Sequence, residues 1–350
     1  MKLCKIQELT GGEILAKDIL TSELKVLLSA GIVLRPEYIA KINSLGITEV
    51  YIEEKLEEKN EVLLLKTSLE NEFHDKVKHI MERHLYSKNK ELMKLSETAD
   101  HIIMSVLEEN RIVEKIYDIK ERSSDIYEHS VNVCSLATLT ALRMKIDKST
   151  VHDIAAGCLL HDIGLRYLPI NYVNRNVHEM TEMEAAEYRK HPVYGYVALK
   201  DEDWISGLVK QIVLYHHERK DRNGFPIRPA EVRKEIGIVS VCDVFDEMIC
   251  GIGYRREKVY QAVEYLKAYR GVSFDSDIVD IFLEFVAVYP VGSKVLLNNG
   301  KKGTVLKQSK GFPDRPVIRL EASQGDNGSA EDRIIDLTQK TSIFVEKVLE

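Results

Sequence analysis

Residues 159–167 read LLHDIGLRY, and this short stretch sets the imidazole of His161 beside the carboxylate of Asp162. Gly164 follows, and glycine both ends helices and lets a chain come close to a ligand. Imidazoles and carboxylates are ligands that manganese, iron and zinc accept, and the two oxygens of a carboxylate can bridge two cations. The stretch therefore predicts the end of a helix at a metal site.

A second His-Asp pair, His152 and Asp153, lies nine residues earlier in the chain. At 100° per residue, nine positions give a half-turn, so on one helix the two pairs face opposite ways. Only one pair can point into a shared site. The earlier pair follows residues 147–150, which are typical of a helix start, where an acidic side chain favours the helix dipole. We interpret His152 as a surface residue.

More side chains of the same two types lie before and after this stretch: His129, His191, His216, His217 and Asp243. A single histidine is more often structural than a ligand. Five histidines and two aspartates in regular segments are hard to explain in that way, and they favour a metal site. Two neighbouring cations can hold a hydroxide nucleophile and neutralise phosphate oxygens at the same time.

We expect a mainly α protein whose chemistry resides in a helical domain at residues 119–288. Residues 1–55 are predicted to form a small α/β module. Within this module we expect a hairpin between Val26–Leu28 and Ile32–Leu34, a helix that begins at Pro36, and a strand at residues 47–52.

Residues 56–118 are predicted to form a helical connector, because apolar residues recur there at spacings of three and four. Two helices are expected, with a break at residues 87–89. The pattern favours an antiparallel pair packed on the main domain or on a second subunit, which would make a homodimer; a signalling helix is the alternative. Residues 289–350 are predicted to form a small β-barrel-like domain with a hairpin turn at Asn299-Gly300.

Composition limits the partners that this chain can bind. A formal net charge of -7 argues against a basic surface for DNA or RNA duplexes, so an anionic substrate would need metal ions or a few local cations. Five cysteines without a CxxC pair suit free thiols in a reducing cytosol. The chain shows neither a signal peptide nor a stretch of membrane-span length, so we expect a cytoplasmic protein.

The order and spacing of several motifs resemble those of the HD-GYP family, a branch of the HD-domain phosphohydrolases, over about residues 119–288. The matching strings are Tyr127-Glu128-His129-Ser130, His161-Asp162-Ile163-Gly164, His191-Pro192, His216-His217-Glu218-Arg219, Gly224-Phe225-Pro226, Asp243-Val244-Phe245-Asp246 and Gly271 with Phe274-Asp275. The resemblance implies an all-helical domain that hydrolyses cyclic di-GMP to pGpG or GMP through a metal-bridging hydroxide. It also implies a centre of two or three iron or manganese ions.

Site residues carry over from the family position by position. Metal ligands would be His129, His161, Asp162, His191, His216, His217 and Asp243, with His161 and Asp162 at the centre of catalysis and Asp162 as the bridge. Asp125, four residues before His129, would hold a third metal, or else it caps the helix. Gly224, Phe225, Pro226 and Arg255 would contact substrate, and Phe225 would stack on a guanine or simply pack.

The chain departs from the family at three positions. Leu165 stands where the family usually has a lysine, Ile252 where it has an arginine, and Phe225 where it has the tyrosine of the GYP motif. One charge-assisted contact contributes about 1.5–3 kcal/mol, so losing two cations should weaken phosphate binding or change the preferred ligand. A slow cyclic-dinucleotide sensor is therefore one alternative, and a hydrolase for another cyclic dinucleotide or nucleotide is a second.

Overall fold

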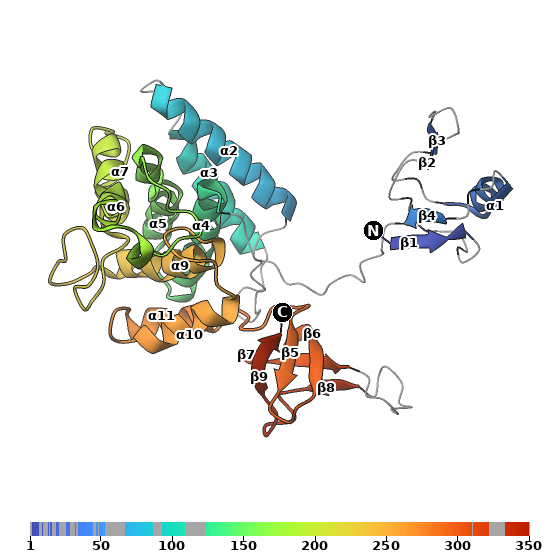
Figure 1. Ribbon diagram of the computed structural model, residues 1–350. Helices are drawn as coiled ribbons and strands as arrows, with labels where there is room; N and C mark the ends of the chain where they lie inside the picture. The colour runs from blue at the N-terminus through green and yellow to red at the C-terminus, as the bar shows by residue number, and fades with distance from the viewer. Residues whose placement is uncertain are drawn as a thin grey trace. The chain divides into compact units, whose positions relative to one another are not determined.

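The fold is described by a computed structural model (Figure 1) that covers residues 67–86, 93–108, 124–309, 311–321 and 333–349, together with residues 2–6, 19–20, 26–28, 34–44, 49–52 and a few single positions near the N-terminus. The chain divides into two compact units, Met1–Lys59 and Asn60–Glu350. The first limit lies close to the predicted end of the α/β module. The other domain limits stay predictions.

The N-terminal unit is a small α/β module, as expected. Strand β1 (Lys2–Lys5) pairs antiparallel with β4 (Glu49–Ile52), β2 (Ile19–Leu20) pairs with β3 (Val26–Leu28), and α1 spans Pro36–Ser44. The helix begins at Pro36 as predicted, since the missing N–H of proline is not needed at that position. The core of the unit is formed by Ile6, Leu15, Ile19, Leu34, Ile42 and Val50.

The predicted hairpin between Val26–Leu28 and Ile32–Leu34 is wrong. Strand β3 pairs with β2, while the N–H of Leu15 donates to the carbonyl of Ile32 at 2.9 Å and the N–H of Leu34 donates to the carbonyl of Glu13 at 2.7 Å. Leu15 and Leu34 are buried in the same core, and this shared burial explains why Ile32–Leu34 pairs with the segment around Leu15.

The second unit is mostly helical (Figure 1), which confirms the mainly α fold. A single hydrophobic core joins nearly all of its helices. Helices α4 and α9 are buried almost all round, which is typical of helices in the interior of a bundle. The helices are α2 (Thr67–Tyr86), α3 (Lys94–Glu108), α4 (Ile126–Arg143), α5 (Lys148–Leu160), α6 (Glu182–Tyr188), α7 (His191–Leu199), α8 (Gly207–Tyr215), α9 (Lys234–Cys250), α10 (Val259–Tyr269) and α11 (Ser276–Leu283), with 3-10 turns η3 (Ile163–Tyr167) and η4 (Val177–Glu179).

The predicted connector contains the two expected helices, α2 and α3. Their apolar stripes, represented by Phe73 and Val77 on α2 and by Ile102 and Val106 on α3, are buried in the core that α4 and α5 also form. Packing on the main domain is therefore confirmed. The expected break at residues 87–89 lies outside the described residues.

The C-terminal part is the expected β-rich domain. Strands β5 (Lys294–Leu297), β6 (Lys302–Ser309), β7 (Phe312–Leu320), β8 (Ile334–Asp336) and β9 (Val345–Leu349) form one antiparallel sheet in the order β8-β7-β6-β5-β9. The turn at Asn299-Gly300 joins β5 to β6 as predicted. Among the described strands, β8 and β9 are the two edges, so closure into a barrel stays a prediction. In the described part of the chain, no helix is long and apolar enough to cross a membrane.

The turn after α5 packs unusually closely on the start of α7. A Cβ atom added to Gly164 would lie 1.9 Å from the carbonyl oxygen of His191, far inside van der Waals contact. Glycine is therefore required here by the approach of two backbones. The contact fixes the start of α7 against the end of α5.

We predict that Gly164→Ala lowers the free energy of unfolding by about 1–3 kcal/mol, because the added methyl group forces these backbones apart. Gly207→Ala is the matched control: Gly207 opens α8, and a Cβ there meets nothing within 4 Å. Urea denaturation of the two variants provides the measurement. Equal stability of Gly164→Ala and wild-type protein would contradict the prediction.

Candidate metal centre

Five helices deliver the seven predicted ligands to one buried point. His129 lies on α4, His161 caps the end of α5 and Asp162 follows it, His191 opens α7, His216 and His217 end α8, and Asp243 lies in the middle of α9. Every one of these residues is at most 4% exposed. Side chains that lie far apart in the sequence thus meet in the interior of the helical domain.

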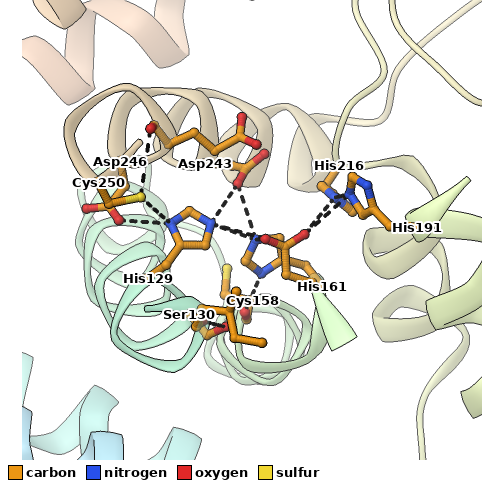
Figure 2. A network of polar contacts seen from close by, with 12 residues as sticks. His129, Ser130, Cys158, His161, His191, His216, Asp243, Asp246 and Cys250 are labelled. Carbon is orange, nitrogen blue, oxygen red and sulfur yellow. Dashed lines mark hydrogen bonds and ion pairs between the residues drawn. The ribbon is translucent and has the colours of Figure 1, made fainter. Parts of the chain in front are cut away.

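A first group of ligand atoms comes from α4, α5 and α9. The Nε2 atoms of His129 and His161 are 3.1 Å apart, and each is 3.2 Å from Oδ1 of Asp243. Figure 2 shows the two imidazoles directed toward each other with Asp243 beside both. The three ligand atoms lie within 4.8 Å of one another, which is close enough for one cation.

A second group comes from the end of α5, α7 and α8. Nε2 of His191 is 3.2 Å from Nε2 of His216 and 3.1 Å from Nε2 of His217. Oδ1 of Asp162 is 3.3 Å from Nε2 of His191, while its Oδ2 is 3.5 Å from the Nε2 atoms of both His129 and His161. Asp162 therefore presents one oxygen to each group, which is the geometry of a bridging carboxylate.

The orientation of the imidazoles follows from hydrogen bonds on their outer side. Nδ1–H of His161 donates to the carbonyl of Cys158 at 2.6 Å, that of His191 to the carbonyl of Tyr188 at 2.8 Å, and that of His216 to the carbonyl of Val213 at 3.0 Å. His129 donates in the same way to Oδ2 of Asp246 at 2.8 Å. A carbonyl can only accept, so the Nδ1 proton is fixed and each Nε2 is left for a proton or a cation.

The residues present fit divalent cations. Oδ2 of Asp162 and Oδ2 of Asp243 are buried and have no hydrogen-bond partner among the described residues. Burying unpaired carboxylate oxygens is costly unless a positive charge lies beside them. Imidazole and carboxylate together are the donor set of iron, manganese and zinc sites.

The pKa values of the histidines shift in opposite directions in the two groups. Burial disfavours charge on His129, but hydrogen bonds to Asp243 and Asp246 outweigh it and raise the pKa of His129 well above its ordinary value. The pKa of His161 is also raised, against the effect of burial, by Asp162 and Asp243. Burial lowers the pKa of His216, and burial with repulsion from His216 lowers that of His217 further.

The two aspartates are ionised at neutral pH. Burial alone would raise the pKa of Asp162, but the charge on His161 and a hydrogen bond from His191 lower it well below its ordinary value. The pKa of Asp243 is lowered in the same way, against burial, by hydrogen bonds from His129 and His161. Both carboxylates are thus in the form that binds cations.

Asp125 occupies the second of its two expected roles. Its Oδ1 accepts from the backbone N–H groups of Tyr127 at 2.8 Å and Glu128 at 3.1 Å, so it is the N-cap of α4. Nε2 of His74 on α2 lies 3.3 Å from the same oxygen. The role as helix cap is thus confirmed, and the alternative role as a ligand of a third metal stays a prediction.

The GYP-like residues surround His217. The ring of Phe225 stacks on that of His217, with centroids 4.5 Å apart and an interplanar angle of 25°. A Cβ at Gly224 would lie 2.4 Å from the carbonyl oxygen of His217, and Pro226 follows a cis peptide bond. These contacts favour the packing role of Phe225, which holds the imidazole in place.

Arg255, predicted to contact substrate, is paired with another side chain. Its Nε donates to Oε1 of Glu179 at 2.7 Å, and 63% of its side chain is exposed. His152, interpreted as a surface residue, is instead partly buried against α3, where it contacts Ser96 at 3.0 Å. His152 lies outside both groups of ligand atoms, whereas His161 of the other His-Asp pair lies in the first group.

The two departures Leu165 and Ile252 meet in space. Both are buried in one apolar cluster with Tyr188 and Cys250, so the two positions at which the family usually has cations lie in an apolar interior instead. Eighty-seven residues separate them in the chain, and only the fold reveals that they are neighbours.

Asp246 and Glu247 are buried polar residues to which the sequence analysis gave no role. Asp246 orients His129 as described above. Glu247 is 1% exposed, and burial with the charges of Asp243 and Asp162 raises its pKa well above the ordinary value. Their spacing of three and four residues after Asp243, which places all three on one helix face, was the signal that could have found them.

A pocket of about 310 Å³ opens beside the centre. His217 and Glu247 lie in its wall together with the aromatic side chains of Tyr188, Phe225, Tyr254 and Tyr265. Pockets lined by aromatic residues with a few polar groups are typical of sites for planar ligands such as nucleobases.

Comparison with known proteins agrees with this geometry. Residues 110–278 match the HD domain, and residues 294–350 match a KOW domain associated with HD domains. Cyclic di-GMP phosphodiesterase PA4108 of Pseudomonas aeruginosa is 29% identical over 247 residues, which cover 69% of this chain and 59% of that protein. The cyclic di-GMP phosphodiesterase response regulator RpfG of Xanthomonas campestris is 26% identical over 227 residues, 59% of this chain and 60% of the relative.

A 3'3'-cGAMP-specific phosphodiesterase 2 of Vibrio cholerae is 23% identical over 255 residues, which cover 69% of this chain and 47% of that enzyme. The chain thus spans about half to three fifths of the length of these relatives.

Among solved structures, the HDG"Y"P protein Bd1817 of Bdellovibrio bacteriovorus superposes with a TM-score of 0.50 at 16% identity. The match covers 80% of this chain and 97% of that one, and it supports the fold. Residues 110–278, which match the HD domain and gather its His-Asp motifs in one buried centre, thus form an HD domain, and the resemblance of the chain to the HD-GYP branch is supported.

Proposed function

We propose that this protein is a metal-dependent phosphodiesterase that hydrolyses cyclic di-GMP to pGpG, GMP or both. The observation that carries the proposal is the bridging position of Asp162 between two groups of buried imidazoles whose Nε2 atoms converge. The match to the HD domain and the names of the relatives support the same activity. Iron or manganese are the metals that the HD-GYP resemblance implies, and this donor set accepts both.

The roles of the residues follow from their geometry. His129, His161 and Asp243 would hold one cation, His191, His216 and His217 would hold the other, and Asp162 would bridge them. When bound, the cations lower the pKa of water and neutralise the oxygens of a phosphate group. In the reaction, water adds to phosphorus, the bond to the ribose 3' oxygen breaks, and the water proton passes to that oxygen.

The pocket beside the centre would receive a base of the substrate. Its aromatic side chains offer flat apolar surfaces on which a guanine can stack. Phe225 and Gly224 would act mainly by holding His217, and Arg255 would reach a phosphate only by leaving Glu179. These substrate contacts are part of the proposal.

A cyclic-dinucleotide sensor with slow turnover is the second candidate. The specific observation in its favour is the apolar cluster around Leu165 and Ile252, which removes two cations from the phosphate site. A hydrolase for a different cyclic dinucleotide is a variant of the first proposal, and a relative named as a 3'3'-cGAMP phosphodiesterase makes that substrate worth testing.

We predict that His161→Ala and Asp162→Ala lose bound metal together with at least about 10³-fold in hydrolysis, because each removes a ligand of the shared centre. His152→Ala is the matched control, since it changes the histidine of the other His-Asp pair, outside the centre. Metal analysis and product chromatography provide the readouts. Full metal content and full activity in Asp162→Ala would refute the bridging role.

The rate of a single turnover distinguishes a phosphodiesterase from a slow cyclic-dinucleotide sensor. We predict that protein loaded with manganese or iron, present in excess over cyclic di-GMP, releases pGpG within a single turnover on the scale of seconds to minutes. Cyclic di-AMP and 3'3'-cGAMP serve as comparison substrates. Tight binding without product would favour the sensor, and faster hydrolysis of a comparison substrate would change the assigned substrate.

We expect the affinity for metal to rise as the pH rises. The pKa of His129 is raised well above its ordinary value and that of His161 is raised, so both rings favour a proton that a cation must displace. We therefore predict proton release on binding and an apparent affinity that rises with pH, about tenfold per pH unit for each proton released. Manganese titration calorimetry in two buffers with different ionisation enthalpies measures the release. Identical heats in both buffers would contradict the prediction.

A further inference from the structure

Arg219 is the one lysine or arginine among the described residues that line the aromatic pocket beside the centre. Its Nη1 is in hydrogen-bonding contact with the backbone carbonyls of His216 at 3.2 Å and Glu218 at 3.1 Å, and with the hydroxyl of Ser240. Its guanidinium carbon lies 4.9 Å from the centre of the Phe274 ring. These contacts hold the guanidinium group in one place in the pocket wall.

Only one nitrogen of this guanidinium group is used by the protein. Within the part of the chain that the structure describes, neither Nε nor Nη2 of Arg219 has a hydrogen-bond or ion-pair partner. Arginine carries five N–H donors in a rigid fork, which matches pairs of neighbouring acceptors. Arg219 therefore offers fixed hydrogen-bond donors to a ligand in the pocket.

Glu247 supplies a hydrogen-bond acceptor to the same pocket wall. Its Oε1 accepts from the hydroxyl of Tyr188 at 3.2 Å, whereas its Oε2 is buried without a hydrogen-bond partner in the described part of the chain. Burying an unpaired polar atom is costly unless a ligand completes its hydrogen bond. Whether ionised or protonated, a carboxyl group keeps an oxygen that can accept.

The donor and the acceptor in this wall do not satisfy each other. The ion-pair contact of Glu247 is with Nε2 of His217 at 3.9 Å, and none joins Glu247 to Arg219 within the described residues. A flat ligand between the aromatic side chains of the pocket can thus meet donors from Arg219 and an acceptor from Glu247 at the same time.

Guanine is the purine base that matches both groups. Its N7 and O6 accept hydrogen bonds, its N1 and its exocyclic N2 donate them, and O6 lies between N7 and N1. Arginine is the usual partner of O6 and N7 together. Adenine instead carries an amino group where guanine has O6, so it would place a donor against the donors of Arg219.

We propose that Arg219 and Glu247 select guanine in this pocket. Arg219 donates to O6 and N7 of the base, and Glu247 accepts from its N1–H and N2 amino groups. The role of this pair rests on the proposed hydrolysis of cyclic di-GMP, and it names the residues that distinguish this substrate from cyclic di-AMP. The base contacts offset part of the affinity lost where Leu165 and Ile252 replace two cations.

The test measures base selectivity, as the ratio of kcat/KM for cyclic di-GMP to that for cyclic di-AMP in the manganese-loaded full chain. A general loss of metal or stability lowers both rates together and leaves this ratio unchanged. Arg219→Lys keeps the charge but loses the fork of donors. Arg233→Lys and Glu235→Gln are the matched controls, because these two residues pair with each other outside the pocket.

We expect wild type and both controls to prefer cyclic di-GMP, and Arg219→Lys to lower this preference roughly 5- to 150-fold, the contribution of one bidentate contact to guanine. Cyclic di-IMP, whose bases lack only the N2 amino group, tests the other contact. Wild type should hydrolyse it more slowly than cyclic di-GMP, and Glu247→Gln should reduce this difference.

Two results would overturn the inference and leave the proposed function standing. One is equal hydrolysis of cyclic di-GMP and cyclic di-AMP by wild type. The other is an unchanged ratio in Arg219→Lys with both substrates slowed alike, which would assign Arg219 to a phosphate group. A preference of wild type for cyclic di-AMP would overturn both the inference and the assigned substrate.

Binding without turnover tests the inference separately from the proposed function. Calorimetric dissociation constants of GMP and AMP give a second measure of base selectivity. If no cyclic dinucleotide is hydrolysed, the proposed function fails, yet a preference for GMP that Arg219→Lys removes would still support the selection of guanine. Equal affinities for GMP and AMP would overturn it.

Discussion

The outward hydrogen bonds of four buried imidazoles determine what this domain can do. His161, His191 and His216 donate Nδ1–H to carbonyls one turn earlier in their own chain segments, and His129 donates to Asp246. Each imidazole is thereby held in one orientation, with Nε2 toward the centre. Because the acceptors are mostly backbone carbonyls near helix ends, the positions of the helices and the direction of the ligand atoms are set together.

The rest of the helical domain buries this arrangement. Helices α4 and α9, which carry His129 and Asp243, are surrounded by the main core, and α2 and α3 cover it further. The close approach of Gly164 to His191 fixes the two groups of ligands relative to each other. A cluster of imidazoles and carboxylates buried in this way is expensive without a compensating charge, and divalent cations supply that charge.

Motifs and helix geometry were enough to predict the mainly α fold and the convergence of the seven side chains. The choice of His161 over His152 rested on the 100° rotation per residue and agrees with the structure. Three features depended on contacts between distant parts of the chain and could not be predicted. The core of the N-terminal unit selected the partner of Ile32–Leu34, Glu179 engages Arg255, and Leu165 meets Ile252. The sequence could not decide between two roles for Asp125, because the residue one turn before His129 can either cap the helix or bind a metal.

Anomalous diffraction from crystals grown with manganese tests the convergence of these ligands most directly. The proposed centre predicts one peak within bonding distance of His129, His161 and Asp243, and a second peak bonded to His191 and His216, with Asp162 contacting both. A map without peaks at these positions under saturating manganese, with the imidazoles still turned toward one another, would contradict the metal centre and the function proposed from it.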